Sequence, residues 1–285
     1  MKLISALHFD PASFIKCYYA DVSILIFRSR VVCQIILYLK KVFKFWFMRQ
    51  MKESSNLNNL LYRESDAVIL LSERFKPAFQ KITGLPKISK LHAIGNSLTY
   101  SVQEEVCPKK KQILLVGRMD FYQKRPERFV QIWSNLEDKY PNWNVLFLGD
   151  GPAKLKTENF AKRLGLKNIR FKGFADPKDA YRESSILCMT STFEGLPMVL
   201  LEAMQFGTVP VAFESFESLH DIITDGVTGY IIEPFDLKQY ANRLESLMTD
   251  ENKRIQMAQK AQKHVTEKFD IETIISHWIE IFEKI

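Results

Sequence analysis

The sequence predicts an α/β fold in which parallel strands form a sheet that helices cover on both faces. Short apolar runs alternate regularly with longer amphipathic segments from residue 110 onward. The runs are apolar at nearly every position, as expected for strands that are buried on both faces. The chain has 285 residues and is 46% hydrophobic, which is enough for one large domain or two ordinary ones. Alternation of this kind is typical of parallel sheets, because each crossover helix covers a face.

The second part of the chain supplies six predicted strands and the helices between them. The strands are expected at residues 111–119, 143–152, 168–174, 185–192, 209–213 and 229–234. The helices are expected at residues 125–140, 153–166, 176–184 and 196–207. Pro126 suits the first turn of its helix, where a missing N–H costs no hydrogen bond. Gly207 suits the position just beyond the end of the last helix.

The first hundred residues are less regular. Strands are expected at residues 2–9, 66–72 and 90–97, with a long helical region between the first two. A break near residue 107 leads us to expect an N-terminal domain over residues 1–107 and a second domain over residues 108–268. The final helix, residues 269–285, carries one apolar stripe that includes Ile274 and Trp278. Such a helix needs a surface to cover, and we expect it to cross back onto the first domain.

Composition and charge narrow the function only slightly. The formal net charge is +7 and the pI about 9.1, which permits nucleic acid, anionic lipid or phosphorylated ligands. The four cysteines are scattered without paired spacing, so a reduced cytoplasmic protein without a zinc site is expected. Arg28 and Arg30 interrupt the most apolar segment, and no transmembrane helix is expected.

Charged side chains and glycines follow several predicted strands. Gly117, Arg118 and Lys124 follow the first strand of the second part, and Glu194 comes just before a helix. In parallel sheets ligands bind beyond the carboxyl ends of the strands. Arginine, lysine and a helix N-terminus suit a diphosphate, whereas carboxylates would repel it and instead accept hydrogen bonds from hydroxyl groups.

The spacing of two glutamates gives an approximate distance between their carboxylates. Glu194 and Glu202 are eight positions apart, and at ~1.5 Å per helical residue they lie on the order of 10 Å apart or somewhat more. One carboxylate could bind a ribose and the other a hexose, with a diphosphate between them. This arrangement describes a nucleotide sugar.

Several motifs in register resemble glycosyltransferase family 4, whose members are retaining enzymes of the GT-B fold. "EGLPMVLLE" matches the E-x7-E motif of that family, and "TSTFEGLPMVLLEAMQFGTVPVAF" and "DIITDGVTGYIIEPFD" match its context. "VGRMDFYQKRPERFV", "LGDGP", "ESDAVILLSERFKPAFQ" and "IGNSL" are also similar in order and spacing. The resemblance covers roughly residue 64 to the C-terminus and implies two Rossmann-like domains that face each other.

The resemblance also implies roles for individual residues. Arg118 and Lys124 would hold the donor diphosphate, Glu202 the ribose and Glu194 the donor hexose. His8 resembles a strand-end histidine that faces the donor sugar, and with Arg118, Lys124 and Glu194 it completes the implied catalytic set. The further donor-binding positions implied by the family are Gly117, Gly149, Gly173, Phe174, Gly195, Leu196, Pro197 and Met198.

The implied reaction transfers a hexose from a nucleotide sugar to a glycan or lipid-linked acceptor in cell-surface polysaccharide synthesis, with retained anomeric configuration. The nucleotide would leave from the front face, and its phosphate would take the proton of the acceptor. No metal or other cofactor is expected, because protein cations neutralise the leaving diphosphate. The segment "AFESFESLHDIITDG" resembles members that use UDP-hexoses more than those that use GDP-mannose.

The basic and aromatic region at residues 31–52 has three interpretations. It could be a helix packed in the first domain with its lysines extended to solvent. It could instead touch anionic lipid, as suits an enzyme with a lipid-linked acceptor at the inner membrane face. Nucleic-acid binding is disfavoured, because no motif supports it.

The first part departs from the family in being much shorter. A glycine-rich first turn is missing, and His8 comes almost at once. The resemblance therefore implies a member with a truncated N-terminal domain, which the C-terminal helix would complete. Two hypotheses follow: a hexosyltransferase, or a nucleotide-sugar-binding fragment or subunit that needs a partner for turnover. A GT-B epimerase or phosphorylase is a lesser alternative.

Overall fold

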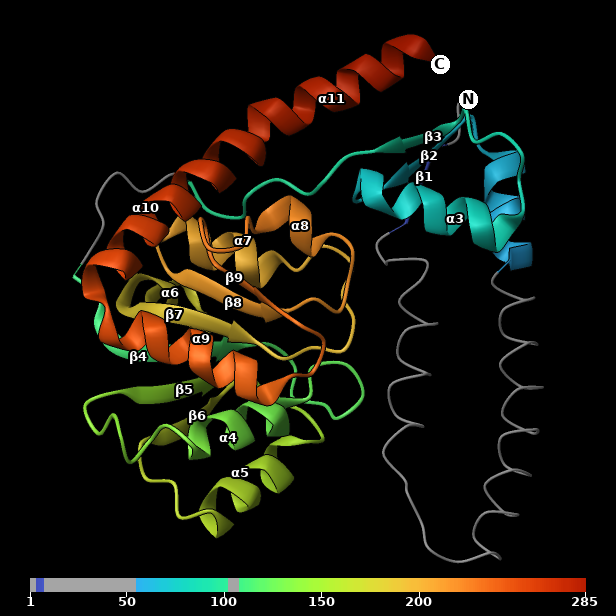
Figure 1. The fold of residues 1–285 in the computed structure, drawn as a ribbon. Helices are drawn as coiled ribbons and strands as arrows, with labels where there is room; N and C mark the ends of the chain where they lie inside the picture. Colours follow the sequence, from blue (N-terminus) through green and yellow to red (C-terminus); the bar gives the residue numbers. More distant parts are fainter. Residues whose placement is uncertain (1–3, 8–54, 102–107) are drawn as a thin grey trace, which may run out of the picture.

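The structure, a computed structural model, describes residues 4–7, 55–101 and 108–285. It contains two parallel sheets, one of three strands and one of six (Figure 1). His8 and the basic region at residues 31–52 lie outside the described residues. Within the described part of the chain, no helix combines the length and the apolar character needed to cross a membrane.

The six-stranded sheet confirms the strands predicted in the second part. Its strands are β4 (Lys110–Val116), β5 (Asn144–Leu148), β6 (Ile169–Gly173), β7 (Ser184–Met189), β8 (Val209–Phe213) and β9 (Tyr230–Ile232). All neighbours pair in parallel, in the order β6-β5-β4-β7-β8-β9. The chain builds outward from β4 to β6 and then returns to pair β7 with β4. The strand order therefore reverses between β4 and β7, where parallel sheets place their ligands.

Helices cover both faces of this sheet, as the sequence predicts. They are α4 (Pro126–Ser134), α5 (Lys154–Arg163), α6 (Lys178–Glu183), α7 (Met198–Gln205), α8 (Leu219–Ile222), α9 (Leu237–Thr249) and α10 (Glu251–Lys268). Successive residues of β4 serve opposite faces, because side chains alternate along a strand. Ile113 belongs to the apolar cluster shared with α4, α5 and α9. Leu114 belongs to the cluster shared with α6, α7 and α8.

Two helix ends show how local chemistry sets the boundaries. Gly207 has a φ of 70° and follows the Phe206 cap of α7, as predicted for a glycine in the left-handed region. The predicted helix 125–140 is shorter in the structure and ends at Ser134. Beyond it the backbone continues in tight turns, with the Leu136 amide donating to the Trp133 carbonyl at 2.9 Å. The short helix α8 was not predicted.

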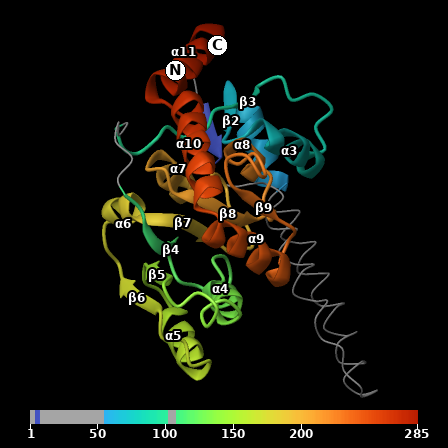
Figure 2. The same cartoon turned by 60° about the vertical axis from the view of Figure 1, so that its left-hand side comes forward.

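The three-stranded sheet consists of β1 (Ile4–Leu7), β2 (Ala67–Leu70) and β3 (Leu91–Ala93), all parallel. A 3₁₀ turn, η1 (Glu73–Phe75), and helix α3 (Lys76–Thr83) follow β2, and residues 55–64 are helical. Helix α11 (Ile271–Lys284) rises from the end of α10 toward this sheet (Figure 2). Its Ile274 and Ile281 are buried against Ala67 and Ile69 of β2, so the last helix packs on the first sheet.

The first sheet also packs directly against the part of the chain that contains the six-stranded sheet. This part is called the second unit below, and the part that contains the first sheet is called the first unit. Val68 and Leu70 of β2 share one apolar cluster with Leu200 of α7 and Phe269. The connecting segment between the two sheets is hydrogen-bonded to the same region, since the Leu98 amide donates to the Phe269 carbonyl at 2.9 Å. These contacts fix how the carboxyl ends of the two sheets lie relative to each other.

Replacing Gly149 by alanine is expected to destabilise the fold strongly. Gly149 has a φ of +151°, and a Cβ there would lie 1.9 Å from the Gly117 carbonyl oxygen, so the turns after β4 and β5 would have to separate. We expect a loss of about 3 kcal/mol or more in the free energy of unfolding, measured by urea denaturation.

Gly165→Ala is the matched control for this substitution. Gly165 has a φ of +74°, and a Cβ added there would have no other atom within 4 Å, so only backbone strain of about 1 kcal/mol is expected. Equal losses for the two variants would contradict the role of backbone contact at Gly149.

Candidate functional site

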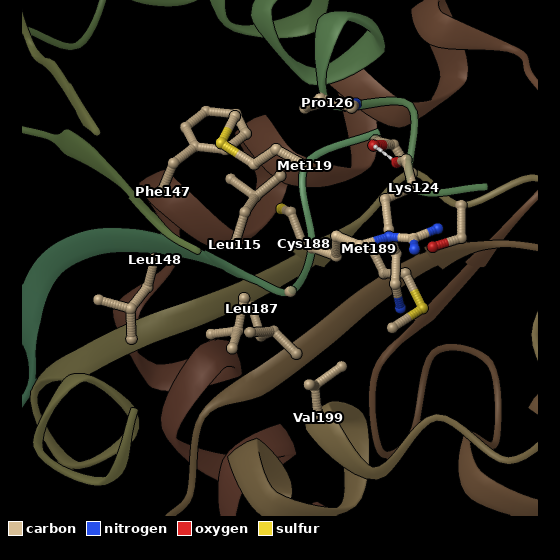
Figure 3. Close-up of a pocket in the computed structure, with 15 residues that line it drawn as sticks. Leu115, Met119, Lys124, Pro126, Phe147, Leu148, Leu187, Cys188, Met189 and Val199 are labelled. Carbon is tan, nitrogen blue, oxygen red and sulfur yellow. Dashed lines mark hydrogen bonds between the residues drawn. The ribbon is translucent and has the colours of Figure 1, made fainter. Parts of the chain in front are cut away.

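A pocket lies at the carboxyl ends of β4 and β7, where the strand order reverses. Figure 3 shows Leu115, Phe147, Leu187 and Val199 around it, with Lys124 at one side. The lining residues are Leu115, Val116, Gly117, Arg118, Met119, Lys124, Pro126, Phe147, Leu148, Leu187, Cys188, Met189, Thr190, Ser191 and Val199. The structure thus brings three predicted site residues, Gly117, Arg118 and Lys124, to one pocket.

The loop between β4 and α4 is held by a buried aspartate. Asp120 Oδ1 accepts from the backbone amides of Tyr122 at 3.0 Å and Gln123 at 2.6 Å. Its other oxygen lies 3.3 Å from Arg118 Nε, although the Arg118 side chain stays 67% exposed. The loop is therefore fixed by its own side chain, and the guanidinium of Arg118 remains accessible to a ligand.

Lys124 and Glu194 form an ion pair at the centre of the site. Lys124 Nζ lies 2.6 Å from Glu194 Oε1, and the glutamate side chain is only 7% exposed. Gln123 Nε2 donates to Glu194 Oε2 at 3.0 Å and to the Phe193 carbonyl at 3.2 Å. Both carboxylate oxygens thus have partners, as a buried charge requires.

The loop that carries Glu194 is anchored from two sides. The Thr192 amide donates to the Gln123 carbonyl at 2.7 Å. The Ser215 hydroxyl donates to the Ser191 carbonyl at 2.8 Å, and the Ser218 hydroxyl donates to the Gly195 carbonyl. After Gly195, Leu196 and Pro197, α7 begins at Met198. The Leu196 side chain is buried in the apolar cluster, so backbone groups are what this turn offers to a ligand.

Glu202 lies on α7 and has two hydroxyl partners. Thr99 Oγ1 donates to Glu202 Oε1 at 2.7 Å, and the Tyr181 hydroxyl donates to Oε2 at 2.8 Å. Burial raises the pKa of Tyr181 far above its usual value, and the charge of Glu202 raises it further. Burial, followed by the charges of Glu202 and Asp176, also raises the pKa of Tyr100. Glu202 therefore accepts hydrogen bonds from two hydroxyl groups of the protein itself.

The predicted glycines and Phe174 lie at the carboxyl ends of the strands. Gly117 has a φ of +141° and faces the Lys124 side chain. Gly149 and Gly173 are hydrogen-bonded to each other, with the Gly149 amide donating to the Gly173 carbonyl at 2.7 Å. Phe174 is 91% exposed. Asp150 comes directly after Gly149. Hydrogen bonds from the Gly151 amide and then from the Lys154 side chain hold the pKa of Asp150 below its usual value.

Sequence reasoning missed four residues that organise the site. Asp120 could have been recognised, because an aspartate in a loop commonly accepts hydrogen bonds from the backbone amides two or three residues further on. No such signal exists for Gln123, Thr99 and Tyr181. Nothing in the neighbouring sequence indicates that a side chain will contact a glutamate many residues away. Thr99 is 103 residues from Glu202, and Gln123 is 71 residues from Glu194.

The comparisons with known proteins agree with this fold. The chain is 29% identical over 216 residues to an uncharacterised glycosyltransferase of Haemophilus influenzae, covering 75% of this chain and 60% of that protein. It is 27% identical over 229 residues to the amylovoran biosynthesis glycosyltransferase AmsD of Erwinia amylovora, covering 77% and 63%. The chain thus spans less than two thirds of the length of these relatives.

Solved structures show the same architecture. The G117R mutant of S. aureus TarM, crystallised with fondaparinux, alpha-GlcNAc-glycerol and UDP, superimposes with a TM-score of 0.73 at 21% identity, over 81% of this chain and 46% of TarM. The fold is therefore the GT-B fold. The model of the family described as "Glycosyl transferases group 1" matches residues 99–264. These residues contain the whole candidate site described above, and the chain belongs to the glycosyl transferases group 1 family.

Proposed function

We propose that the protein transfers a hexose from UDP to a glycan or lipid-linked acceptor in cell-surface polysaccharide synthesis, with retention of anomeric configuration. The observation that carries the proposal is the arrangement around the strand-order reversal. Lys124 and Arg118 follow β4, Glu194 follows β7, and Glu202 lies about one turn along α7. We propose that the two cations bind the diphosphate, with Glu194 at the hexose on one side of it and Glu202 at the ribose on the other.

The basic side chains supply the charge that the leaving group requires. Negative charge develops on the diphosphate as the glycosidic bond breaks, and preorganised cations stabilise that charge. The Arg118 guanidinium can grip two phosphate oxygens. Lys124 carries three donors and can keep its bond to Glu194 while it contacts a phosphate. We propose that no metal ion takes part, because these two side chains fill the role that a metal ion has elsewhere.

The carboxylates are proposed to bind the two sugars. Glu202 already accepts from Thr99 and Tyr181, and ribose hydroxyls can take the place of the Thr99 hydroxyl. Glu194 is fixed by Lys124 and Gln123, and we propose that its oxygens also accept hydrogen bonds from hexose hydroxyls. Departure of UDP from the front face, with its phosphate taking the proton of the acceptor, fits a site that holds the reactants close together.

The acceptor class rests on the relatives. AmsD is named for amylovoran biosynthesis, and TarM was crystallised with alpha-GlcNAc-glycerol and UDP. We propose the same broad class here, a growing glycan or a lipid-linked saccharide. An acceptor of the second kind would place the protein at the inner face of the membrane.

Thermal unfolding with UDP, GDP and ADP tests the donor. A ligand at one hundred times its dissociation constant stabilises the folded state by about 2.7 kcal/mol, which corresponds to a rise of several degrees in Tm. We expect that rise with UDP and none with GDP or ADP, in the presence of EDTA as in its absence. No rise with any of the three would refute nucleotide-sugar binding.

Turnover separates an enzyme from a binding subunit. Release of UDP from UDP-glucose, UDP-galactose or their N-acetylated forms is expected with the purified chain. A UDP-dependent rise in Tm without any release or transfer would instead support the alternative, a donor-binding protein that needs a partner. That alternative is kept because the chain spans less than two thirds of the length of its relatives.

A further inference from the structure

We propose a second pocket, at the carboxyl ends of β8 and β9, as the site that holds an uncharged sugar residue of the acceptor. This inference rests on the proposed function and adds the substrate class of its acceptor side. The pocket has a volume of about 430 Å³, within the range of small-molecule sites. Its lining residues are Arg74, Glu214, His220, Ile223, Thr224, Asp225, Ile231, Glu233, Gln239 and Arg243.

The pocket adjoins the loop that carries Glu194. The segment after β8 bonds to that loop through Ser215, whose hydroxyl donates to the Ser191 carbonyl, and through Ser218, whose hydroxyl donates to the Gly195 carbonyl. Glu214 and His220, which flank this segment, line the second pocket. A single stretch of chain therefore separates the second pocket from the turn proposed to face the donor hexose.

The pocket walls are held by hydrogen bonds within the protein. In the loop before β9, the Gly226 amide donates to the Gly229 carbonyl at 2.9 Å. Asp225 Oδ1 accepts from the Ile231 amide at 3.0 Å. On α9, Gln239 Oε1 accepts from the Glu233 amide at 2.8 Å. Such a preformed wall lowers the cost of ordering on ligand binding.

The turn after β2 of the first sheet contributes one lining residue of the pocket, Arg74. Arg74 belongs to η1, which follows β2, and its Nε lies 3.6 Å from Asp221 Oδ1. The Ser72 hydroxyl donates to the other oxygen of Asp221, and Lys268 Nζ donates to the Asp221 carbonyl at 2.7 Å. Asp221 thus fixes Arg74 to the second unit, and the lining of the pocket includes a residue of the first unit.

The polar groups of the pocket suit hydroxyl groups better than phosphate. Three carboxylates, those of Glu214, Asp225 and Glu233, line it together with Arg74 and Arg243. His220 Nε2 lies 2.8 Å from Glu214 Oε1. The carboxylates would repel an anion, whereas a sugar hydroxyl can donate to a carboxylate and accept from a guanidinium at the same time. The Glu214, Asp225 and Arg243 side chains are all roughly half exposed and can reach a ligand.

Saturation-transfer NMR on the full chain with UDP present tests the site. The probes are methyl α-D-galactopyranoside and methyl N-acetyl-α-D-glucosaminide, with glycerol 3-phosphate as the anionic probe. At least one glycoside is expected to bind and glycerol 3-phosphate is not. The double variant Glu214→Gln/Glu233→Gln keeps the shape of both side chains and is expected to weaken glycoside binding about tenfold or more.

Glu158→Gln on α5, outside the pocket lining, is the control and is expected to bind as the unmodified protein does. The inference is overturned if no glycoside binds, if the double variant binds glycoside unchanged, or if glycerol 3-phosphate binds in its place. The rise in Tm with UDP should be the same in all three proteins. If UDP does not raise the Tm of the unmodified protein, the proposed function itself is overturned. Failure of the acceptor-site inference can therefore be distinguished from failure of the proposed function.

Discussion

Glu202→Ala is expected to abolish the UDP-dependent rise in Tm. The carboxylate is the group proposed to accept the ribose hydroxyls, and hydrogen bonds to a charged group contribute about 1.5–3 kcal/mol each. Losing one or two of them lowers the UDP affinity by about tenfold to more than a thousandfold. Thermal unfolding over a UDP titration measures this loss. A normal UDP response in Glu202→Ala would remove the ribose-binding role from this residue.

The structure adds a second consequence for the same variant. Tyr181 is buried and its hydroxyl donates to Glu202, so alanine leaves that hydroxyl without its acceptor. The free energy of unfolding without ligand is expected to fall by about 1–3 kcal/mol. Tyr181→Phe is the matched control, because it removes the same hydrogen bond and keeps the carboxylate. It is expected to retain the rise in Tm with UDP, which separates a loss of ligand binding from a loss of stability.

Lys124→Met is expected to lower turnover roughly 10²–10³-fold, as removal of one preorganised charge-stabilising group does. The UDP affinity should fall as well, because the diphosphate loses a charged partner. UDP release from the preferred UDP-sugar and a UDP titration measure the two effects. Unchanged affinity and unchanged turnover would place Lys124 outside the donor site.

A second substitution at Glu194, the ion-pair partner of Lys124, separates the effect of Lys124 on stability from its effect on activity. In Lys124→Met the Glu194 carboxylate stays buried and keeps only the hydrogen bond from Gln123, which is expected to cost about 3 kcal/mol of stability. The double variant Lys124→Met/Glu194→Gln removes the buried charge and should recover most of that stability. It should not recover UDP binding or turnover. Recovery of activity together with stability would show that Lys124 acts only by supporting the fold.

Much of the fold could be predicted, because its signals are local. Apolar runs of strand length and the alternation with amphipathic helices follow from residue type and period alone. The six strands of the second unit and the helix starting at Pro126 were placed correctly in this way. The helix predicted to run to residue 140 ends at Ser134. In the turns beyond it, the Glu137 carboxylate accepts from the backbone amides of Lys167 and Asn168, contacts that no local pattern records.

The candidate site could be predicted only in part. The motif positions Arg118, Lys124 and Glu194 were chosen from the sequence, and the structure brings them to one place. The ion pair between Lys124 and Glu194 was not foreseen, because nothing in the sequence says which cation faces which carboxylate. The partners of Glu202 were missed for the same reason: Thr99 lies on the segment between the sheets and Tyr181 on α6.

The sequence by itself determined the six strands of the second unit and most of the helices between them, the GT-B glycosyltransferase class, and the residue types available at the carboxyl ends of the strands. Tertiary structure alone decided which of these side chains meet, that Asp120 fixes the loop carrying the cations, and that Arg74 joins Glu214 and Arg243 in a second pocket. The physical reason is the separation along the chain between the residues that interact. Backbone conformation and hydrophobic period are set by neighbours in the chain, whereas ion pairs and pockets depend on how separate elements pack, and packing is a property of the whole fold.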